Sequence, residues 1–405
     1  MGVQFTNRQK ELIEMAHWLG REKFAPRAAK YDAEGSFPVE NYRDMKEAGF
    51  LALCIPVHAG GLGADYETYC HVASTIGYYC GTTANTFNMH SASMLWPGRM
   101  IDDIESITPE ARKQHNERRE KIWADVVKNG SIFAQPFSEP NTAAATGKQP
   151  FGTTAEKVDG GWLVRGKKYF ASLSGHADYY TVVCTEMRNG EELDQKHTIM
   201  MAVPAKADNF KVTGVWDTLG MRGTVSRTLE IDGAFVPDDL QMMPSGGYYQ
   251  AALHWPAMFA TLQPTYIGIA RAAFDFTVKY LRGEWPGAKV SKRADPAKQL
   301  AVAEMRLKLE QANTLFEWLA ANARHKQPKD ERLRMYAAQY TVMEYSNDIC
   351  RLAIRTCGGN TIQKAFPLER LYRDSRAGSL MLPWTAEICM NRLGRESLYE
   401  PGERD

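Results

Sequence analysis

The sequence predicts an α+β protein, in which a helical N-terminal domain is followed by a strand-rich central domain and a helical C-terminal bundle. Two observations lead to this class. Apolar residues recur with helical spacing toward both ends of the chain, and short apolar stretches separated by turn residues fill the middle. The changes in pattern place the domains at residues 1–130, 131–240 and 241–405.

The first 130 residues follow the helical period. Leu12, Met15, Ala16 and Leu19 are spaced i, i+3, i+4, i+7, and similar stripes occupy 42–52 and 66–79. The Pro- and Gly-containing stretch 54–63 predicts a loop. The highly charged stretch 101–130 predicts a solvated helix with a connecting loop.

The central region reads as strands from Ser131 onward. Asp159-Gly160-Gly161 lies between two apolar stretches and predicts a hairpin turn. Further stretches follow at about 8–12-residue intervals, which is typical of a small antiparallel barrel or sandwich. The pattern therefore predicts a central antiparallel β domain.

Helical periodicity returns in the C-terminal region. One long helix contains Tyr266, Ile269, Ala273 and Tyr280 on one face, and others are expected over roughly 296–325, 330–357 and 366–396. Long helices with apolar stripes pack as a bundle.

The composition excludes several classes of protein. Lys plus Arg total 49 and Asp plus Glu total 48, so the chain lacks the basic excess of a nucleic-acid binder. No apolar run approaches the roughly 18 residues of a membrane span, and no secretion signal is visible at the N-terminus. The seven cysteines are scattered without a CxxC pair, which predicts neither disulfides nor a metal site and favours the cytoplasm.

The common catalytic motifs are missing. There is no P-loop, HExxH, GxSxG or strand-linked GxGxxG. Ser172, Ser174 and His176 form a polar turn between two expected strands, but a nucleophile would need a third group that the sequence does not place. From the residues alone the site stays unidentified.

Four stretches resemble motifs of the acyl-CoA dehydrogenase family of FAD flavoproteins, in the order and spacing of that family. They are IFAQPFSEP (132–140), GKKYFASLSGHADYY (166–180), WDTLGMRGTVSRTLEIDGAFVP (216–237) and RTCGGNTIQKAFPLERLYRDSRAGSL (355–380). The resemblance covers nearly the whole chain. It implies a helical N-terminal domain, a central β domain, a C-terminal four-helix bundle, an FAD cofactor and a homodimer or homotetramer.

The resemblance also implies cofactor-binding residues. A flavin needs apolar walls for its ring and hydrogen-bonding groups at its edges. By the family pattern Ala134, Phe137 and Ser138 would line the flavin, Phe170 would cover one side, and Ser172 would hydrogen-bond the ring edge.

Two further groups of residues match parts of the family that hold the rest of FAD. Cys357, Gly358 and Gly359 would let the FAD of a neighbouring subunit approach the backbone. Thr385 and Glu387 match a Thr-x-(Glu/Gln)-Ile pattern that contacts the adenosine half of FAD.

The sequence departs from the family at the catalytic base. The Glu that removes an α-proton in most members aligns with Pro383, and its alternative position aligns with Met258, or with Phe259 after a one-residue slip. None of these side chains can act as a base. The Asp and Arg that many members use near the CoA thioester align with Pro256 and Phe259. The family therefore suggests CoA as the carrier, but two of its usual CoA-binding residues are replaced here.

His254 is the candidate catalytic residue. It precedes Met258 by four positions, so on a continuous helix the two side chains would share a face. Imidazole titrates near neutral pH and suits a general base. The alternative interpretation is a partly buried histidine at a domain junction.

Three hypotheses follow. The first is an FAD-dependent oxidoreductase that oxidises an acyl thioester with a displaced or absent Glu base, passing electrons to an electron-transfer flavoprotein or oxygen. The second is a flavin-dependent monooxygenase on the same fold, which needs no α-proton base and could use Ser172, Ser174 and His176 beside the flavin. The third is a non-catalytic subunit of a hetero-oligomeric acyl-CoA dehydrogenase.

Overall fold

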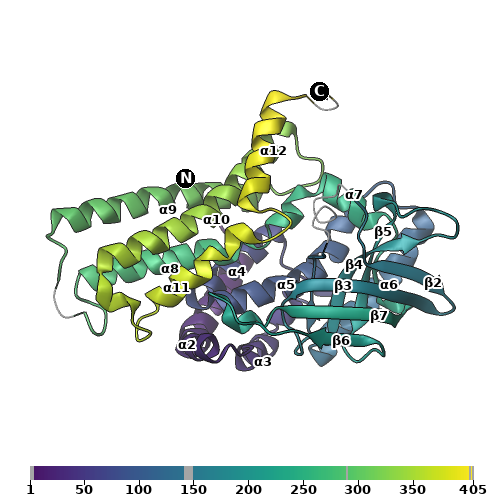
Figure 1. Cartoon of the computed structure of the whole chain (residues 1–405), viewed down its shortest axis with the longest axis horizontal. Coiled ribbons are helices and arrows are strands. Elements are labelled where there is room, and N and C mark those ends of the chain that lie inside the picture. The colour runs from purple at the N-terminus through teal and green to yellow at the C-terminus, as the bar shows by residue number, and fades with distance from the viewer. Residues whose placement is uncertain (1–3, 141–148, 289–290, 401–402, 404–405) are drawn as a thin grey trace.

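The chain folds into a sheet-containing part and a long helical bundle, with the N-terminal helices packed between them (Figure 1). A computed structural model describes residues 4–140, 149–288, 291–400 and 403. Helix α4 packs against α8 of the bundle, and α5 contacts β1 of the sheet. The α+β class and the order of helical, β and helical parts are confirmed.

The N-terminal part is made of six α-helices in the described residues. They are α1 (Asn7–Leu19), α2 (Ala25–Glu34), α3 (Val39–Glu47), α4 (Tyr66–Tyr79), α5 (Gly81–Gly98) and α6 (Pro109–Asn129). Helix α1 begins at Thr6, whose side chain accepts a hydrogen bond from the Gln9 N–H. Helix α5 is buried along almost its whole length, so its side chains can reach a site between the domains.

Over the described residues the central part is one eight-stranded sheet, with strand order β6-β7-β3-β2-β4-β5-β8 and β1 beside β4. Its strands are β1 (Phe133–Ala134), β2 (Thr154–Val158), β3 (Gly161–Ala171), β4 (Tyr179–Met187), β5 (Thr198–Pro204), β6 (Phe210–Thr213), β7 (Arg227–Pro237) and β8 (Gln241–Met243). The β2–β3 hairpin at Asp159-Gly160 is confirmed, with Gly160 at φ 72°. The sheet is mixed rather than wholly antiparallel, because β1 and β2 both run parallel to β4.

The C-terminal part is a bundle of long helices that lie side by side (Figure 1). A short helix, α7 (Gly247–His254), leads into α8 (Gln263–Leu281), α9 (Pro296–Asn322) and α10 (Lys329–Cys357). Two shorter helices, α11 (Leu368–Arg376) and α12 (Ala386–Leu398), pack against α10. No helix of the described ranges has the length and apolar character needed to cross a bilayer.

The prediction of one helix over 366–396 is wrong. Helix α11 ends at Arg376, and α12 starts only after Thr385 caps it by accepting from the Ile388 N–H. Pro383 lies between them and has no N–H to continue a helix. The chain between the two helices therefore runs as an irregular segment, and part of it faces a cavity.

A buried ion pair joins Glu139, in the segment that follows β1, to Lys168 on β3. Lys168 Nζ on β3 donates to Glu139 Oε1 at 2.6 Å and to the Val183 carbonyl at 2.9 Å, and both charged side chains are at most 2% exposed. Glu139 also accepts from the N–H groups of Gly152 and Thr153. Burial alone would raise the pKa of Glu139, but the Lys168 charge and these hydrogen bonds lower it overall.

We predict that Glu139→Gln destabilises the protein strongly, by about 3–5 kcal/mol, because it leaves the Lys168 ammonium buried without a counter-charge. Urea unfolding measures the change. Glu156→Gln is the matched control, because Glu156 on β2 also pairs with a cation of β3, Arg165, but the Arg165 and Glu156 side chains are 46% and 49% exposed. Loss of that exposed pair should cost less than about 1 kcal/mol. Equal effects of the two variants would contradict the prediction.

Candidate functional site

A cavity of about 390 Å³ lies where the sheet, the N-terminal helices and the bundle meet. Its wall is mostly apolar, with a few amide and hydroxyl side chains and two arginines. The residues that line it come from α5, the segment after β1, the end of β3, the β6–β7 loop, the segment before α8, and α11 with the chain that follows it. Its size lies in the range of small-molecule sites.

The sheet side of the cavity carries four of the residues expected from the sequence. Phe137, Ser138, Phe170 and Ser172 all line it. The Tyr169 N–H donates to the Ser138 carbonyl at 2.8 Å, which holds the two stretches together. Phe170 has φ 53°, is 65% exposed and lines the cavity, so it is not part of the packed interior of the sheet.

The β6–β7 loop lines another side of the cavity with residues between Trp216 and Ser226. Its backbone lies so close to α11 that a Cβ on Gly220 would come within 2.2 Å of the Arg373 carbonyl oxygen. The next N–H, of Met221, donates to Asp374 Oδ1 at 2.6 Å. Only a glycine permits this approach, so Gly220 is required by packing rather than by a turn.

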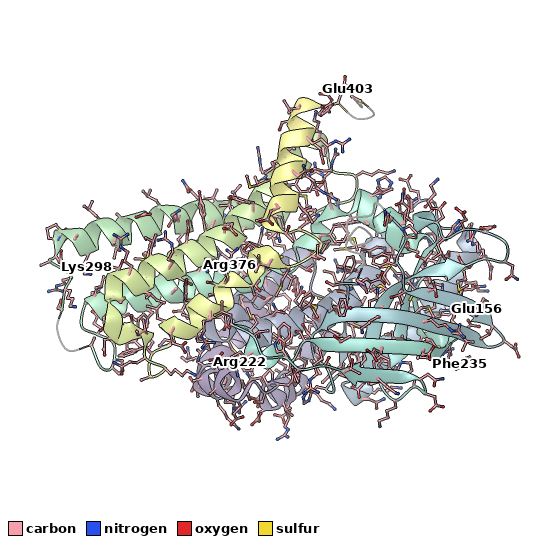
Figure 2. All side chains as sticks on the ribbon, in the orientation of Figure 1. Glu156, Arg222, Phe235, Lys298, Arg376 and Glu403 are labelled. Atoms are coloured by element: carbon pink, nitrogen blue, oxygen red, sulfur yellow. The ribbon has the colours of Figure 1, made fainter. Side chains whose placement is uncertain are left out.

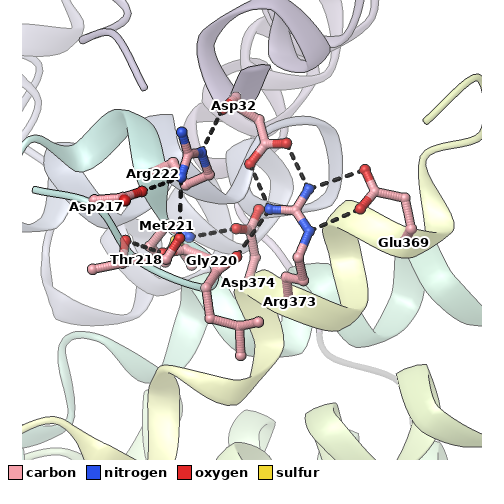
Figure 3. Close-up of polar contacts among 10 residues, drawn as sticks. Asp32, Asp217, Thr218, Gly220, Met221, Arg222, Glu369, Arg373 and Asp374 are labelled. Atoms are coloured by element: carbon pink, nitrogen blue, oxygen red, sulfur yellow. Dashed lines mark hydrogen bonds and ion pairs between the residues drawn. The ribbon is translucent and has the colours of Figure 1, made fainter. Parts of the chain in front are cut away.

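Ion pairs and hydrogen bonds fasten this loop from both sides (Figure 3). Arg373 of α11 donates to both carboxylate oxygens of Asp32 on α2, at 2.8 and 2.6 Å, and to the Leu219 carbonyl. Arg222 of the loop donates to the Asp32 carbonyl at 2.9 Å. Residues from all three parts of the chain therefore meet at one point beside the cavity.

Helix α5 contributes polar residues that the sequence analysis did not single out. Asn85, Asn88 and Trp96 line the cavity. Asn88 donates to Tyr69 and to the Thr261 carbonyl, both at 2.7 Å, whereas Asn85 Oδ1 and Trp96 Nε1 have no partner among the described residues. Two amides three positions apart in a buried helix were the signal that could have revealed them.

The two positions at which the sequence analysis expected the family's base both lie on the cavity wall. Met258 and Pro383 line it, as does Phe259. Among the described residues, the wall contains no Asp, Glu, His, Lys, Cys or Tyr, and its only ionisable side chains are Arg373 and Arg376. The described wall thus offers no group that could take a proton near neutral pH.

His254 does not line the cavity. It is the last residue of α7, and Trp255 has φ −120° and ψ 61°, so the helix stops there and 256–260 forms a 3₁₀ segment. The continuous helix that a shared face of His254 and Met258 would require is therefore not formed. The His254 ring lies 5.5 Å from that of His325, and burial together with the neighbouring cations lowers its pKa.

The remaining residues expected at the cofactor lie away from this wall. Ala134 is buried in β1, next to Gln135, which does line the cavity. Thr385, two positions after the lining residue Pro383, caps α12, and Glu387 is exposed in the first turn of that helix. Their contacts to FAD stay predictions.

Cys357, Gly358 and Gly359 lie at the C-terminal end of α10. A Cβ on either glycine would meet nothing within 4 Å, so this backbone is open to an approaching group. Of the polar turn, Ser172 alone reaches the cavity; Ser174 donates to the Ala171 carbonyl, and His176 stacks on Phe37 with centroids 4.5 Å apart.

The cavity fits the requirements of a flavin ring. Phe137, Phe170 and Trp216 offer aromatic faces, and Ser138 and Ser172 offer hydroxyls. Gln135 is 7% exposed and its Nε2 has no partner in the described part of the chain. Aromatic walls with few polar groups are what a planar heterocycle with polar edges needs. Fold and site together define a three-part oxidoreductase of the flavin-binding type.

Family models identify the chain directly. The N-terminal, middle and C-terminal domain models of acyl-CoA dehydrogenase match residues 6–99, 134–234 and 260–381. The chain belongs to the acyl-CoA dehydrogenase family, whose members are flavin oxidoreductases or oxygenases. The expected family and the enzyme class are confirmed.

Two curated relatives match over nearly the full length. The putative acyl-CoA dehydrogenase YdbM of Bacillus subtilis is 27% identical and covers 93% of this chain and 94% of its own. Benzylmalonyl-CoA dehydrogenase of Aromatoleum aromaticum is 25% identical and covers 98% and 99%.

Solved structures share the fold. Butyryl-CoA dehydrogenase from Megasphaera elsdenii superposes with a TM-score of 0.81, 19% identity and coverage of 98% of this chain and 100% of its own. FMN-bound TdsC from Paenibacillus sp. A11-2, a dibenzothiophene monooxygenase, gives 0.80 at 21% identity with coverage of 96% and 97%.

The buried carboxylate of Asp374 predicts a pH effect on stability. Burial raises its pKa from 3.8 to about 6, although the Met221 N–H and Arg370 oppose the shift. The native state therefore holds this proton more tightly than the unfolded state, and the contribution of Asp374 to stability falls as pH rises from about 4 to about 6.

Asp374→Asn should remove that slope and should be stabilising relative to wild type above pH 6, since the amide keeps an acceptor for Met221 without a charge. Urea midpoints across pH 4–7 measure it. Asp217→Asn is the control, because Asp217 belongs to the same network but its side chain is 86% exposed. A wild-type slope retained in Asp374→Asn would contradict the assignment.

Proposed function

We propose that this chain is a flavin-dependent oxygenase of the acyl-CoA dehydrogenase fold. The observation that carries the proposal is the chemistry of the cavity wall. The two positions expected for the family's proton-abstracting Glu hold Met258 and Pro383, and no described lining residue is a carboxylate or another base. Removal of an α-proton needs a base within hydrogen-bond reach, whereas oxygen transfer does not.

FAD is the cofactor proposed for the site, with FMN as the form that the TdsC structure contains. Phe170 and Trp216 would flank the ring, while Ser138, Ser172 and the unpaired Gln135 amide would hydrogen-bond its edges. A bound reduced flavin would supply the two electrons of this chemistry, in which one atom of O₂ enters the substrate and the other leaves as water with two protons. An external electron donor would be needed to reduce the flavin again.

The described wall also indicates the kind of substrate. Met89, Met258, Leu262, Leu380 and Met381 surround the space beside the aromatic residues. The amides of Asn85 and Asn88 add local polarity without charge. An aromatic or aliphatic molecule with one or two polar atoms matches this wall, and an apolar enclosure also limits the access of water to the reacting centre.

Oxidation of an acyl thioester is the second candidate. A neighbouring cavity of about 320 Å³ shares Phe259 with the first and carries Arg332 and Arg392. Two cations beside an apolar cavity could receive the phosphates of an acyl-CoA, and both curated relatives named above carry dehydrogenase names. This reading requires a base that the described wall lacks.

One experiment separates the two candidates. The purified flavoprotein is mixed with a panel of acyl-CoA esters without oxygen, and separately reduced and mixed with ¹⁸O₂ and candidate aromatic or aliphatic substrates. We expect no bleaching of the flavin by the esters and ¹⁸O in a product of the second reaction. Rapid anaerobic bleaching by any ester would instead establish the dehydrogenase reading.

Phe170→Ala should weaken flavin binding about tenfold with little loss of fold stability, since its ring packs on the ligand space and is 65% exposed. Fluorescence titration with FAD and with FMN measures the affinity. Phe235→Ala is the control: it is 45% exposed on β7 at the far end of the sheet (Figure 2) and does not line the cavity. An unchanged flavin affinity in Phe170→Ala would contradict the placement of the flavin against Phe170.

A further inference from the structure

Three hydroxyl side chains form a continuous hydrogen-bonded row along the cavity wall. Ser172 Oγ lies 2.8 Å from Ser226 Oγ, which lies 2.7 Å from Thr224 Oγ1. Thr224 Oγ1 is in turn 2.8 Å from the carbonyl oxygen of Met221. All three hydroxyl residues line the cavity and are at most 7% exposed. We refer to Ser172, Ser226 and Thr224 as the hydroxyl row.

The carbonyl at the end of the row determines the direction of every bond in it. A carbonyl oxygen can only accept, and each hydroxyl has a single proton to donate. Thr224 therefore donates to Met221, so the proton between Thr224 and Ser226 belongs to Ser226. The proton between Ser226 and Ser172 must then belong to Ser172.

The anchor is held rigidly. The Met221 carbonyl also accepts from Trp216 Nε1 and from the Thr224 N–H, both at 3.1 Å, and the Met221 N–H donates to Asp374. Met221 and Val225 flank the turn with φ of 53° and 48°. Side chains with positive φ cost free energy that surrounding contacts must offset. The N–H groups of Leu173 and Ser174 donate to the carbonyls of Thr224 and Val225, so backbone contacts hold the turn in addition to the hydroxyls.

We propose that Ser172 is a hydrogen-bond acceptor toward the cavity, and that Ser226 and Thr224 are positioning residues that make it so. The site then prefers a ligand that offers an N–H at this point. This inference rests on the proposed flavin function and adds to it that the ring atom facing Ser172 is N5. Oxidised flavin has a bare lone pair at N5, whereas reduction by two electrons adds a proton there.

The consequence is a preference for the reduced cofactor. A lone pair of Ser172 facing the lone pair of oxidised N5 is unfavourable, and the same lone pair accepts the N5–H of the reduced ring. A site that binds the reduced flavin more tightly suits an enzyme that must present reduced flavin to oxygen. A freely rotating serine would accommodate both states by turning its proton.

The test compares the affinity of the oxidised and the reduced cofactor in variants of the row. Affinities for FAD and FMN are measured anaerobically in the oxidised and the dithionite-reduced form. Thr224→Val removes the anchoring bond with little change of shape, so the row can reverse and Ser172 can donate. We expect the ratio of reduced to oxidised affinity to fall about three- to tenfold, where tenfold corresponds to about 30 mV for a two-electron couple.

Two companion variants make the direction of the row visible. Ser172→Ala removes the acceptor without creating a donor, so its ratio should lie between wild type and Thr224→Val. Ser226→Ala frees the Ser172 proton by a different route and should resemble Thr224→Val, which keeps the inference testable if one variant does not fold. Ser174→Ala is the control, because it loses a hydroxyl from the same turn but not from the row or the cavity wall.

The outcomes separate the inference from the function on which it rests. If Thr224→Val and Ser226→Ala lose the same affinity for the oxidised and the reduced flavin, Ser172 faces an N–H that reduction does not change. That result would overturn the inference but not the proposed function. A ratio that rises in Thr224→Val would also overturn it. Failure of wild type to bind FAD or FMN in either state would overturn the proposed function and the inference together.

Discussion

The cavity depends on the contacts of one guanidinium group. Arg373 on α11 pairs with Asp32 of α2 and donates to the Leu219 carbonyl of the β6–β7 loop, so it connects the three parts of the chain at a single point. Its pairing with Asp32 raises its pKa further, and Glu369 on the same helix completes the set of partners. A charge with this many directional partners fixes the position of the loop far better than apolar contact does.

The position of that loop has chemical consequences. It brings Gly220 against α11, places the Met221 N–H on the Asp374 carboxylate, and aims the Met221 carbonyl at Thr224. Buried polar groups of this kind are stabilising only when each has its partner. The same contacts that join the domains therefore also set the hydrogen-bonding character of the cavity wall.

The buried pair of Glu139 and Lys168 plays the corresponding role inside the sheet domain. It ties the segment after β1 to β3, and its two residues adjoin Ser138 and Tyr169 in the chain. Glu139 and Lys168 belong to two of the motif stretches in the sequence. In the structure their ion pair holds together the two segments that carry Ser138 and Phe170 on the cavity wall. Such a pair contributes more to the specific arrangement of the strands than to the net free energy of folding.

The sequence by itself determined the order of helical and β parts, the Asp159-Gly160 hairpin and the family, because periodicity and turn chemistry are local properties. It also grouped Phe137, Ser138, Phe170 and Ser172, which line one cavity, since they lie within recognisable stretches. Their contacts to a flavin stay predictions. Only the tertiary structure decided that His254 ends its helix away from the cavity, that 366–396 divides into two helices, and that Asn85, Arg373 and the row from Ser172 to Thr224 meet there. These features arise from contacts between residues that are distant in sequence, and the direction of a hydrogen bond is fixed only once its last acceptor is in place.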